Sequence, residues 1–259
     1  MPRHEPTVSG LINPHLDGSS FHWPAGPVGI LLVHGFTATT VEVRDLAKSL
    51  LAAGYTVAGP LLPGHYTQPT DLNHVRWQDW VKTVEQEYAQ VAKECRNVVV
   101  GGESTGGLLA LYLASHHPEV AAVLTYAPAL RLQISAWDRL RLRLLAAFIP
   151  SIPKPKAGQD TRWQGYPVYP LRGTLQFLRL QQEVRRSLPA IQQPLLVVQG
   201  RLDPTVHPGV PEEIVTGVNS QVCELHWMER SHHVVLLDDE LEQATEITLR
   251  FLHRVLTSA

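Results

Sequence analysis

The chain has 259 residues, of which 44% are hydrophobic and 18% charged, and its formal net charge is −2. This composition is typical of a folded globular protein and excludes a disordered chain. The negative net charge and the lack of a nucleic-acid-binding motif argue against a nucleic-acid partner. No apolar run reaches the roughly 18 residues of a membrane span, and Met1–Gly10 lacks signal-peptide features, so we expect no stable membrane insertion. Two cysteines are too few for a disulfide framework, which favours a reducing, cytoplasmic location.

The charge is distributed unevenly along the chain. Residues 131–186 carry 11 basic and 3 acidic side chains, so this segment has a net charge of +8 and the remainder −10. A shift this sharp predicts that the middle segment is structurally distinct. Two explanations are open: scattered ion pairs hold the segment to the rest of the fold, or its positive charge attracts anionic or interfacial substrates.

Short apolar runs alternate with stretches of helical spacing. Strands are predicted at residues 29–33, 55–58, 97–101, 121–125, 195–199 and 221–226. Helices are predicted at residues 41–53, 77–94, 106–116 and 238–256. Strands that are apolar throughout are typical of a parallel sheet covered on both faces, so the alternation predicts a mostly parallel, doubly wound α/β fold. The first 28 residues are expected to form loops or a short edge strand.

The alternation of strands and helices breaks after Pro128. Between residues 130 and 194 we expect no strand, only helical pieces rich in Arg and Leu. We therefore predict a core of residues 1–129 and 195–259, with residues 130–194 as an inserted helical lid over the carboxyl edge of the sheet, where open α/β folds bind ligands. Apolar lid residues could face an acyl chain or could pack the lid onto the sheet; they are Leu140, Leu142, Leu144, Leu145 and Phe148.

The segment Gly102–Gly106 has the form G-x-S-x-G and lies between a predicted strand and a predicted helix. In that context the sharp turn lifts the serine hydroxyl clear of the sheet. A serine hydroxyl is a poor nucleophile near neutral pH, and it needs a base that is itself oriented by an acid. Ser104 is therefore the candidate nucleophile.

Candidates for the acid and the base follow later strands. Asp203 comes just after the predicted strand 195–199, and the pair His232–His233 lies in a loop after the strand 221–226. The chain order of nucleophile, acid and histidine is the order that this type of fold uses. Position alone leaves the choice between the two histidines open.

A stabilised oxyanion requires two backbone N–H donors. One is expected from Thr105, the residue after the nucleophile, and the other from Phe36 in the loop that follows the strand 29–33. His34 in the same loop is interpreted as a structural residue that holds the loop by hydrogen bonds.

Several motifs together resemble the α/β-hydrolase superfamily, in particular bacterial monoacylglycerol lipases and small thermostable carboxylesterases. They are the His34-Gly35-Phe36 loop, Leu62–His65, Gln78–Val81, Gly102–Gly107, His116–Glu119, Gln199–Asp203 and Ser231–Glu240. The resemblance implies a serine ester hydrolase with Ser104 as nucleophile, Asp203 as acid and His233 as base. It implies Phe36 and Thr105 as oxyanion donors, a small-molecule ester as substrate, and no cofactor or metal. A lid of this size suggests short-to-medium acyl esters or monoacylglycerols.

Some points stay open at this stage. Glu103 departs from the residues common beside the nucleophile, and its carboxyl group could bind a polar group or be buried and protonated. Alternatives to the ester hydrolase are a thioesterase or acyltransferase with the same triad and, from another class, a noncatalytic binding protein of this fold. The sequence leaves the natural substrate and the oligomeric state open.

Overall fold

The computed structural model describes residues 10–155 and 161–257. Its central sheet has the strand order β1-β3-β2-β4-β5-β8-β9. Neighbouring strands run parallel except β1, which pairs antiparallel with β3 at the edge. The strands are β1 (Phe21–Trp23), β2 (Val28–Val33), β3 (Thr56–Gly59), β4 (Asn97–Glu103), β5 (Ala122–Tyr126), β8 (Leu195–Gly200) and β9 (Cys223–Met228). The predicted parallel α/β sheet with a short edge strand is confirmed.

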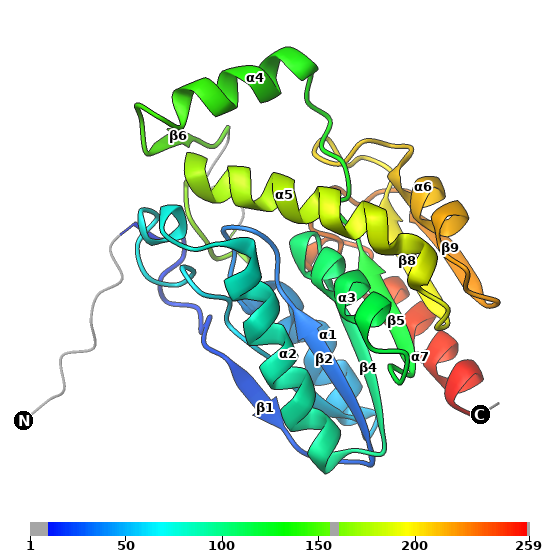
Figure 1. Cartoon of the computed structure of the whole chain (residues 1–259). Coiled ribbons are helices and arrows are strands. Elements are labelled where there is room, and N and C mark those ends of the chain that lie inside the picture. The colour runs from blue at the N-terminus through cyan, green and yellow to red at the C-terminus, as the bar shows by residue number, and fades with distance from the viewer. Residues whose placement is uncertain (1–9, 156–160, 258–259) are drawn as a thin grey trace, which may run out of the picture.

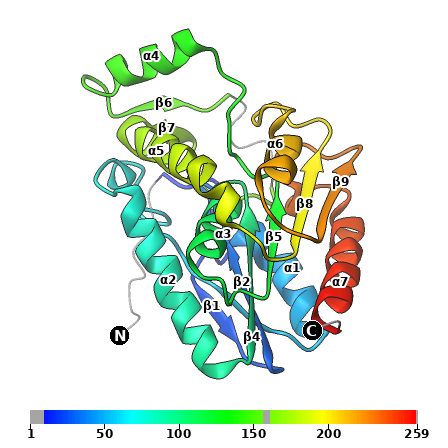
Figure 2. The ribbon, with the colours of Figure 1, turned by 45° about the vertical axis from the view of Figure 1, so that its right-hand side comes forward.

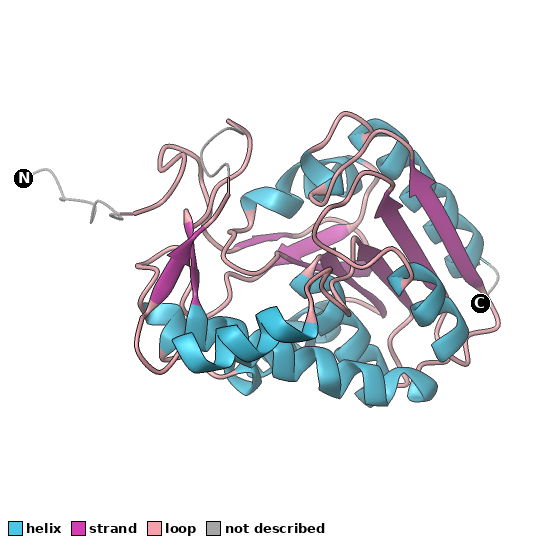
Figure 3. Ribbon diagram, turned by 90° about the horizontal axis from the view of Figure 1, so that it is seen from above, coloured by secondary structure: helices cyan, strands magenta, loops and turns pink. Residues whose placement is uncertain are grey.

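Helices cover both faces of the sheet (Figures 1 and 3). One face packs against α1 (Val41–Ala52) and α7 (Leu241–Thr257). The other packs against α2 (Trp77–Glu94), α3 (Thr105–His116), α5 (Leu171–Ser187) and α6 (Val210–Gly217). Alternate residues of β4 enter the two cores, so this strand is buried on both sides, which explains the unbroken apolar run at residues 98–100.

Helix α2 illustrates how the local sequence determines where a helix forms and which face it buries. Its buried stripe of Trp80, Val84, Tyr88 and Val91 has helical spacing and faces the sheet. At its N-terminus the Asp79 carboxylate accepts the N–H of Arg76 at 2.8 Å. This bond satisfies a backbone donor that has no carbonyl partner within the helix. The predicted bounds of this helix, 77–94, are those observed.

The segment between β5 and β8 differs in part from its prediction. It contains α4 (Ala136–Leu145), β6 (Ser151–Pro153), β7 (Val168–Pro170) and α5. The expectation of no strand in this segment is wrong, because β6 and β7 form a separate antiparallel pair. Each is three residues long and carries a proline, so neither shows the apolar alternation by which strands are recognised.

The two helices of this segment have different surroundings. Helix α5 lies between α4 and the sheet (Figures 1 and 2), and it buries Phe177, Leu180 and Val184 in the core shared with α3. Helix α4 buries no residue, and Leu144 and Phe148 are 60% and 85% exposed. The alternative that the apolar lid residues pack onto the sheet is therefore wrong for Leu140, Leu144, Leu145 and Phe148. The division into core and lid stays a prediction, and residues 1–9, 156–160 and 258–259 of those ranges lie outside the described residues.

Short 3-10 turns complete the fold at η1 (Asp71–Asn73), η2 (Leu188–Ala190) and η3 (Val235–Leu237). Within residues 10–155 and 161–257, no helix combines the length and the apolar character that a bilayer span requires.

Candidate active site

The sharpest turn in the site follows β4. Ser104 has φ 55° and ψ −108°, a left-handed conformation that is strained for any residue with a side chain. The turn passes so close to β2 that a Cβ atom on Gly106 would lie 1.9 Å from the carbonyl oxygen of Val33, and one on Gly102 would lie 2.4 Å from it. The two glycines of the G-x-S-x-G motif are thus required by contact with the neighbouring strand, and the turn brings Ser104 to the carboxyl edge of the sheet.

Ser104, His233 and Asp203 form a hydrogen-bonded chain. The distance from His233 Nε2 to Ser104 Oγ is 3.0 Å, and the distance from His233 Nδ1 to Asp203 Oδ2 is 2.8 Å. The three residues follow β4, β8 and β9, whose carboxyl ends lie at one edge of the parallel sheet. His232 lies outside this chain, because its ring contacts Asp238 at 3.2 Å and its side chain is 63% exposed.

The Asp203 carboxylate is almost fully buried and accepts hydrogen bonds at both oxygens. The N–H groups of Thr205 and Val206 donate to Oδ1 at 2.7 and 3.1 Å, and Gln199 Nε2 donates to Oδ2 at 2.8 Å. Burial by itself raises the pKa of Asp203, but the charge of His233 and the hydrogen bonds from His233, Thr205 and Val206 outweigh it and lower the pKa below its usual range. The carboxylate is therefore held ionised against the imidazole.

Two backbone N–H groups are the predicted donors to the oxyanion. They belong to Phe36, in the β2–α1 loop (residues 34–40), and to Thr105, at the start of α3. Neither N–H has a hydrogen-bond acceptor within the described part of the chain. A Cβ atom on Gly35 would lie 3.3 Å from Ser104 Cβ, so this loop runs directly beside the serine.

Two buried histidines hold the β2–α1 loop. His34 Nε2 accepts the N–H of Leu62 at 3.1 Å, and His65 Nε2 accepts the N–H of Thr37 at 3.1 Å. Burial lowers the pKa of His34 to about 4 and that of His65 well below its usual range, so both rings are neutral and can accept these bonds. The interpretation of His34 as a structural residue is confirmed.

Glu103, beside the nucleophile, is fully buried. Its Oε2 accepts the N–H of Leu236 at 3.1 Å, and its Oε1 has no partner within the described residues. Burial and then the charge of Glu42 raise the pKa of Glu103 well above its usual range, which favours the protonated form of this carboxyl group. Of the two alternatives, the structure shows the buried carboxyl group, which ties the nucleophile turn to the segment after His233, and its protonation stays a prediction.

Replacing Glu103 by glutamine is expected to change the pH dependence of stability. The folded protein keeps a proton that the unfolded chain loses above its ordinary pKa near 4.5, so the free energy of unfolding of the wild type falls as the pH rises from that value through the raised folded pKa. Each unit by which the folded-state pKa is raised lowers the free energy of unfolding by about 1.4 kcal/mol, which corresponds to about 3 °C of Tm at this chain length. The neutral amide of Glu103→Gln avoids this cost. The Tm of the variant minus the Tm of the wild type should therefore be larger at pH 8 than at pH 5.

Thermal unfolding measured at both pH values checks this expectation. Glu246→Gln, on the exposed surface of α7, is the matched control and should show the same difference from the wild type at both. A Glu103→Gln variant whose Tm difference is also constant with pH would show that the buried carboxyl group is ionised in the folded protein.

Some site residues were not found from the sequence. Gln199 bonds Asp203, and Glu42 accepts the N–H of Gly35 at 2.7 Å and the indole N–H of Trp163 at 2.8 Å. Gln199 lies inside the motif that contains Asp203, so its place four residues before a candidate acid was an available signal. Trp163 is 121 residues from Glu42, and no local pattern relates them.

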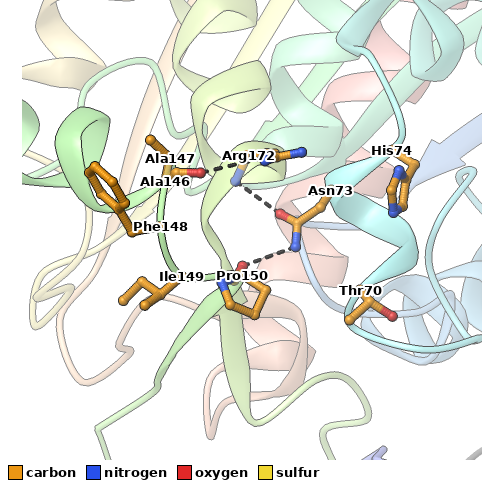
Figure 4. A pocket seen from close by; sticks show the side chains of 9 residues that line it. All are labelled: Thr70, Asn73, His74, Ala146, Ala147, Phe148, Ile149, Pro150 and Arg172. Atoms are coloured by element: carbon orange, nitrogen blue, oxygen red, sulfur yellow. Dashed lines mark hydrogen bonds between the residues drawn. The ribbon is translucent and has the colours of Figure 1, made fainter.

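The described residues contain no group of three or more His, Cys, Asp or Glu side chains placed to hold a metal ion. A cleft of about 240 Å³ opens elsewhere, between η1 and the turn after α4 (Figure 4). There Asn73 accepts the N–H of Arg172 at 2.9 Å and donates to the carbonyl of Pro150 at 2.9 Å. None of the cleft residues belongs to the Ser104–His233–Asp203 chain, so the cleft is separate from the candidate active site.

Comparison with known proteins identifies the family. The profile of the family described as serine aminopeptidase, S33, matches residues 28–169 and 167–240. The chain belongs to this family. The predicted α/β-hydrolase fold and the resemblance to ester hydrolases are confirmed by this match and by the relatives that follow.

Relatives of this S33 family member include characterised ester hydrolases. A thermostable monoacylglycerol lipase of Bacillus sp. (strain H-257) is 34% identical over 239 residues, covering 92% of this chain and 96% of the lipase. A carboxylesterase of Bacillus subtilis (strain 168) is 27% identical over 242 residues, covering 91% and 96%. A solved structure from work on the metagenome-derived lipolytic enzymes LipS and LipT superposes with a TM-score of 0.85 at 28% identity, covering 92% of this chain and 98% of that one.

Proposed function

We propose that this chain is a serine carboxylic ester hydrolase that acts through an acyl-enzyme intermediate. The observation that carries the proposal is the Ser104–His233–Asp203 chain, with distances of 3.0 and 2.8 Å between its polar atoms. Distances in this range allow a proton to pass from the serine hydroxyl to the imidazole as the serine attacks.

In the acylation step Ser104 Oγ attacks the ester carbonyl carbon while His233 Nε2 takes the hydroxyl proton. Asp203 orients the ring through Nδ1 and stabilises the imidazolium that forms. The N–H groups of Phe36 and Thr105 bind the oxyanion of the tetrahedral intermediate. As the carbon–oxygen bond of the ester breaks, His233 gives its proton to the leaving alcohol.

In the deacylation step a water molecule takes the place of the alcohol. His233 removes a proton from the water, which attacks the acyl-serine carbonyl carbon. Collapse of the second tetrahedral intermediate releases the carboxylic acid, and His233 returns its proton to Ser104. The cycle uses only side chains and backbone groups of this chain.

The substrate class that we propose is a short-to-medium acyl ester or a monoacylglycerol. The monoacylglycerol lipase and the carboxylesterase among the relatives support this class. Trp137 and Leu144 on α4 and Phe148 in the turn after it are exposed, and such apolar side chains are suited to an amphiphilic substrate that arrives from a lipid surface. Both cysteines are free thiols, which supports a reducing, cytoplasmic location.

A substrate series tests the proposed class. We expect kcat/KM for p-nitrophenyl esters to peak at an acyl chain of about 4 to 12 carbons, and monoacylglycerols to be hydrolysed faster than triacylglycerols. Acyl-CoA thioesters and an added alcohol acceptor serve as controls for the thioesterase and acyltransferase alternatives. Higher kcat/KM on thioesters, or acyl transfer that exceeds hydrolysis, would replace the ester hydrolase by one of those activities.

A further inference from the structure

The β2–α1 loop is fixed at Thr37 by partners from outside the loop. Thr37 has φ 64°, a conformation that β-branched residues rarely adopt, so surrounding contacts must hold it. Its N–H donates to His65 Nε2 at 3.1 Å, and its carbonyl oxygen accepts the N–H of Tyr166 at 2.8 Å. The strained residue therefore depends on a contact with the segment between β5 and β8.

Lys154, from the same inserted segment, reaches the Thr37 side chain. The residue follows β6, and its ammonium group donates to Thr37 Oγ1. Thr37 Oγ1 donates in turn to the carbonyl oxygen of Phe36 at 2.5 Å. A continuous path thus runs from the lysine to Phe36, the residue expected to supply an oxyanion donor.

The Lys154 amine is packed against two aromatic rings. Its Nζ lies 4.5 Å from the ring centre of Trp163 and 5.1 Å from that of Tyr169, and within the described residues it forms no ion pair. The titratable groups that face it are Glu42, on α1, His65, on the loop after β3, and Tyr169, on β7. Burial lowers the pKa of Lys154 to about 7, although the Glu42 charge opposes the shift. An amine held between two aromatic rings and the Thr37 hydroxyl, beside the loop of the expected oxyanion donor, points to a role beyond packing.

Two aromatic contacts fix the other side of the loop. The ring of Phe36 stacks on that of Phe177 with centres 5.6 Å apart, and meets the edge of Trp80 at 5.8 Å. The Gly35 N–H is fixed by Glu42, which is itself bonded to Trp163 of the inserted segment. The direction of the Phe36 N–H is therefore set by its own partly buried ring and by the contacts of its two neighbours.

We propose that Lys154 is a positioning residue: through the Thr37 hydroxyl it aims the Phe36 N–H at the oxyanion, so that the inserted segment completes the active site. The proposal rests on the proposed function. The lysine touches no reacting atom and acts only through the loop. Its loss should therefore weaken binding of the tetrahedral state more than binding of the ester.

The test compares Lys154→Met with a control, Lys48→Met, whose side chain is 62% exposed on α1. For Lys154→Met we expect kcat on a p-nitrophenyl ester to fall about 10- to 100-fold, because loss of a whole oxyanion donor costs about 10²- to 10³-fold. KM should change less than about threefold. The affinity for a trifluoromethyl ketone, which forms a tetrahedral adduct with the serine, should fall by the same factor as kcat/KM. Lys48→Met should match the wild type.

A double-mutant cycle assigns the effect to the hydrogen bond. Thr37→Val keeps the β-branched shape but removes the hydroxyl, so it should reproduce the loss seen for Lys154→Met. The double variant should be no slower than the slower single variant, and Lys154→Arg, which keeps a donor, should recover part of the activity.

Three results would overturn the proposal. The first is wild-type kcat and ketone affinity in Lys154→Met, and the second is additive losses in the double-mutant cycle. The third is a raised KM and a lowered Tm in Lys154→Met with kcat unchanged. If Lys154→Met does not fold, Thr37→Val carries the test alone, and wild-type kinetics in that variant would overturn the proposal. A wild-type protein without ester hydrolysis that depends on Ser104 would contradict the proposed function instead, so the two failures are distinguishable.

Discussion

Replacing Ser104 by alanine is expected to lower kcat for p-nitrophenyl ester hydrolysis by about 10⁴- to 10⁶-fold. The reason is that no acyl-enzyme can form without the hydroxyl that lies 3.0 Å from His233 Nε2. The oxyanion donors and the binding site persist, so a residual rate above that in water should remain. Initial rates over a range of substrate concentrations measure the loss.

The fold should survive this substitution. Ser104 contributes its backbone to the turn, where its N–H donates to the carbonyl of Tyr126 at 2.8 Å, and alanine keeps that bond. Far-UV circular dichroism and Tm should therefore stay close to those of the wild type. A folded Ser104→Ala variant that retains near-wild-type turnover would remove the serine from the mechanism.

Alanine at His233 is expected to be nearly as damaging, with a loss in kcat of about 10⁴-fold or more, whereas alanine at His232 should cost less than about threefold. Only the ring of His233 lies between Ser104 and Asp203, and the ring of His232 is exposed beside Asp238. The two variants differ by one position in the same loop, so each serves as the control for the other. Rates at pH 8 measure both.

Two other results of this pair of substitutions would contradict the assignment of His233 as the base. A dead His232→Ala variant with an active His233→Ala variant would mean that the loop rearranges in the working enzyme. Equal losses would point to damage to the loop, for example to the bonds by which Glu240 accepts the Ser231 hydroxyl at 2.7 Å and the Arg230 N–H at 2.8 Å.

The sheet and most of its helices were predictable because their residues repeat with the period of the element. The strand and helix pattern alone placed α2 at its observed bounds, and β2, β4, β5 and β8 within two residues of theirs. Helix α6 (Val210–Gly217) was missed, since eight residues with a proline near the start show too short a periodic pattern.

The inserted segment was the least predictable part. Its strands β6 and β7 pair with each other although at least 14 residues separate the paired positions along the chain. A pairing at that sequence distance leaves no local sequence signal. The apolar residues of α4 have the spacing of a packed helix, yet the fold leaves them exposed. Exposure of an apolar face depends on what lies opposite it, which a single sequence does not specify.

In the site, residues at strand ends were predictable and buried partners were not. Ser104, Asp203 and His233 follow strands of a parallel sheet, so topology brings them together. The raised pKa of Glu103 depends on its burial and on Glu42, which is 61 positions away along the chain. Lys154 and Thr37 are 117 positions apart in the chain, so their contact could not be predicted from local sequence either.

The central claim is that Ser104 is the nucleophile, and covalent labelling tests it most directly. The wild-type protein is incubated with an alkyl fluorophosphonate, which reacts with activated serines, and its intact mass and labelled peptide are determined. The account predicts one phosphonyl group per chain on Ser104, no label in Ser104→Ala and labelling slowed by several orders of magnitude in His233→Ala. Labelling of another residue at the wild-type rate, or a folded wild-type protein that takes up no label, would contradict it.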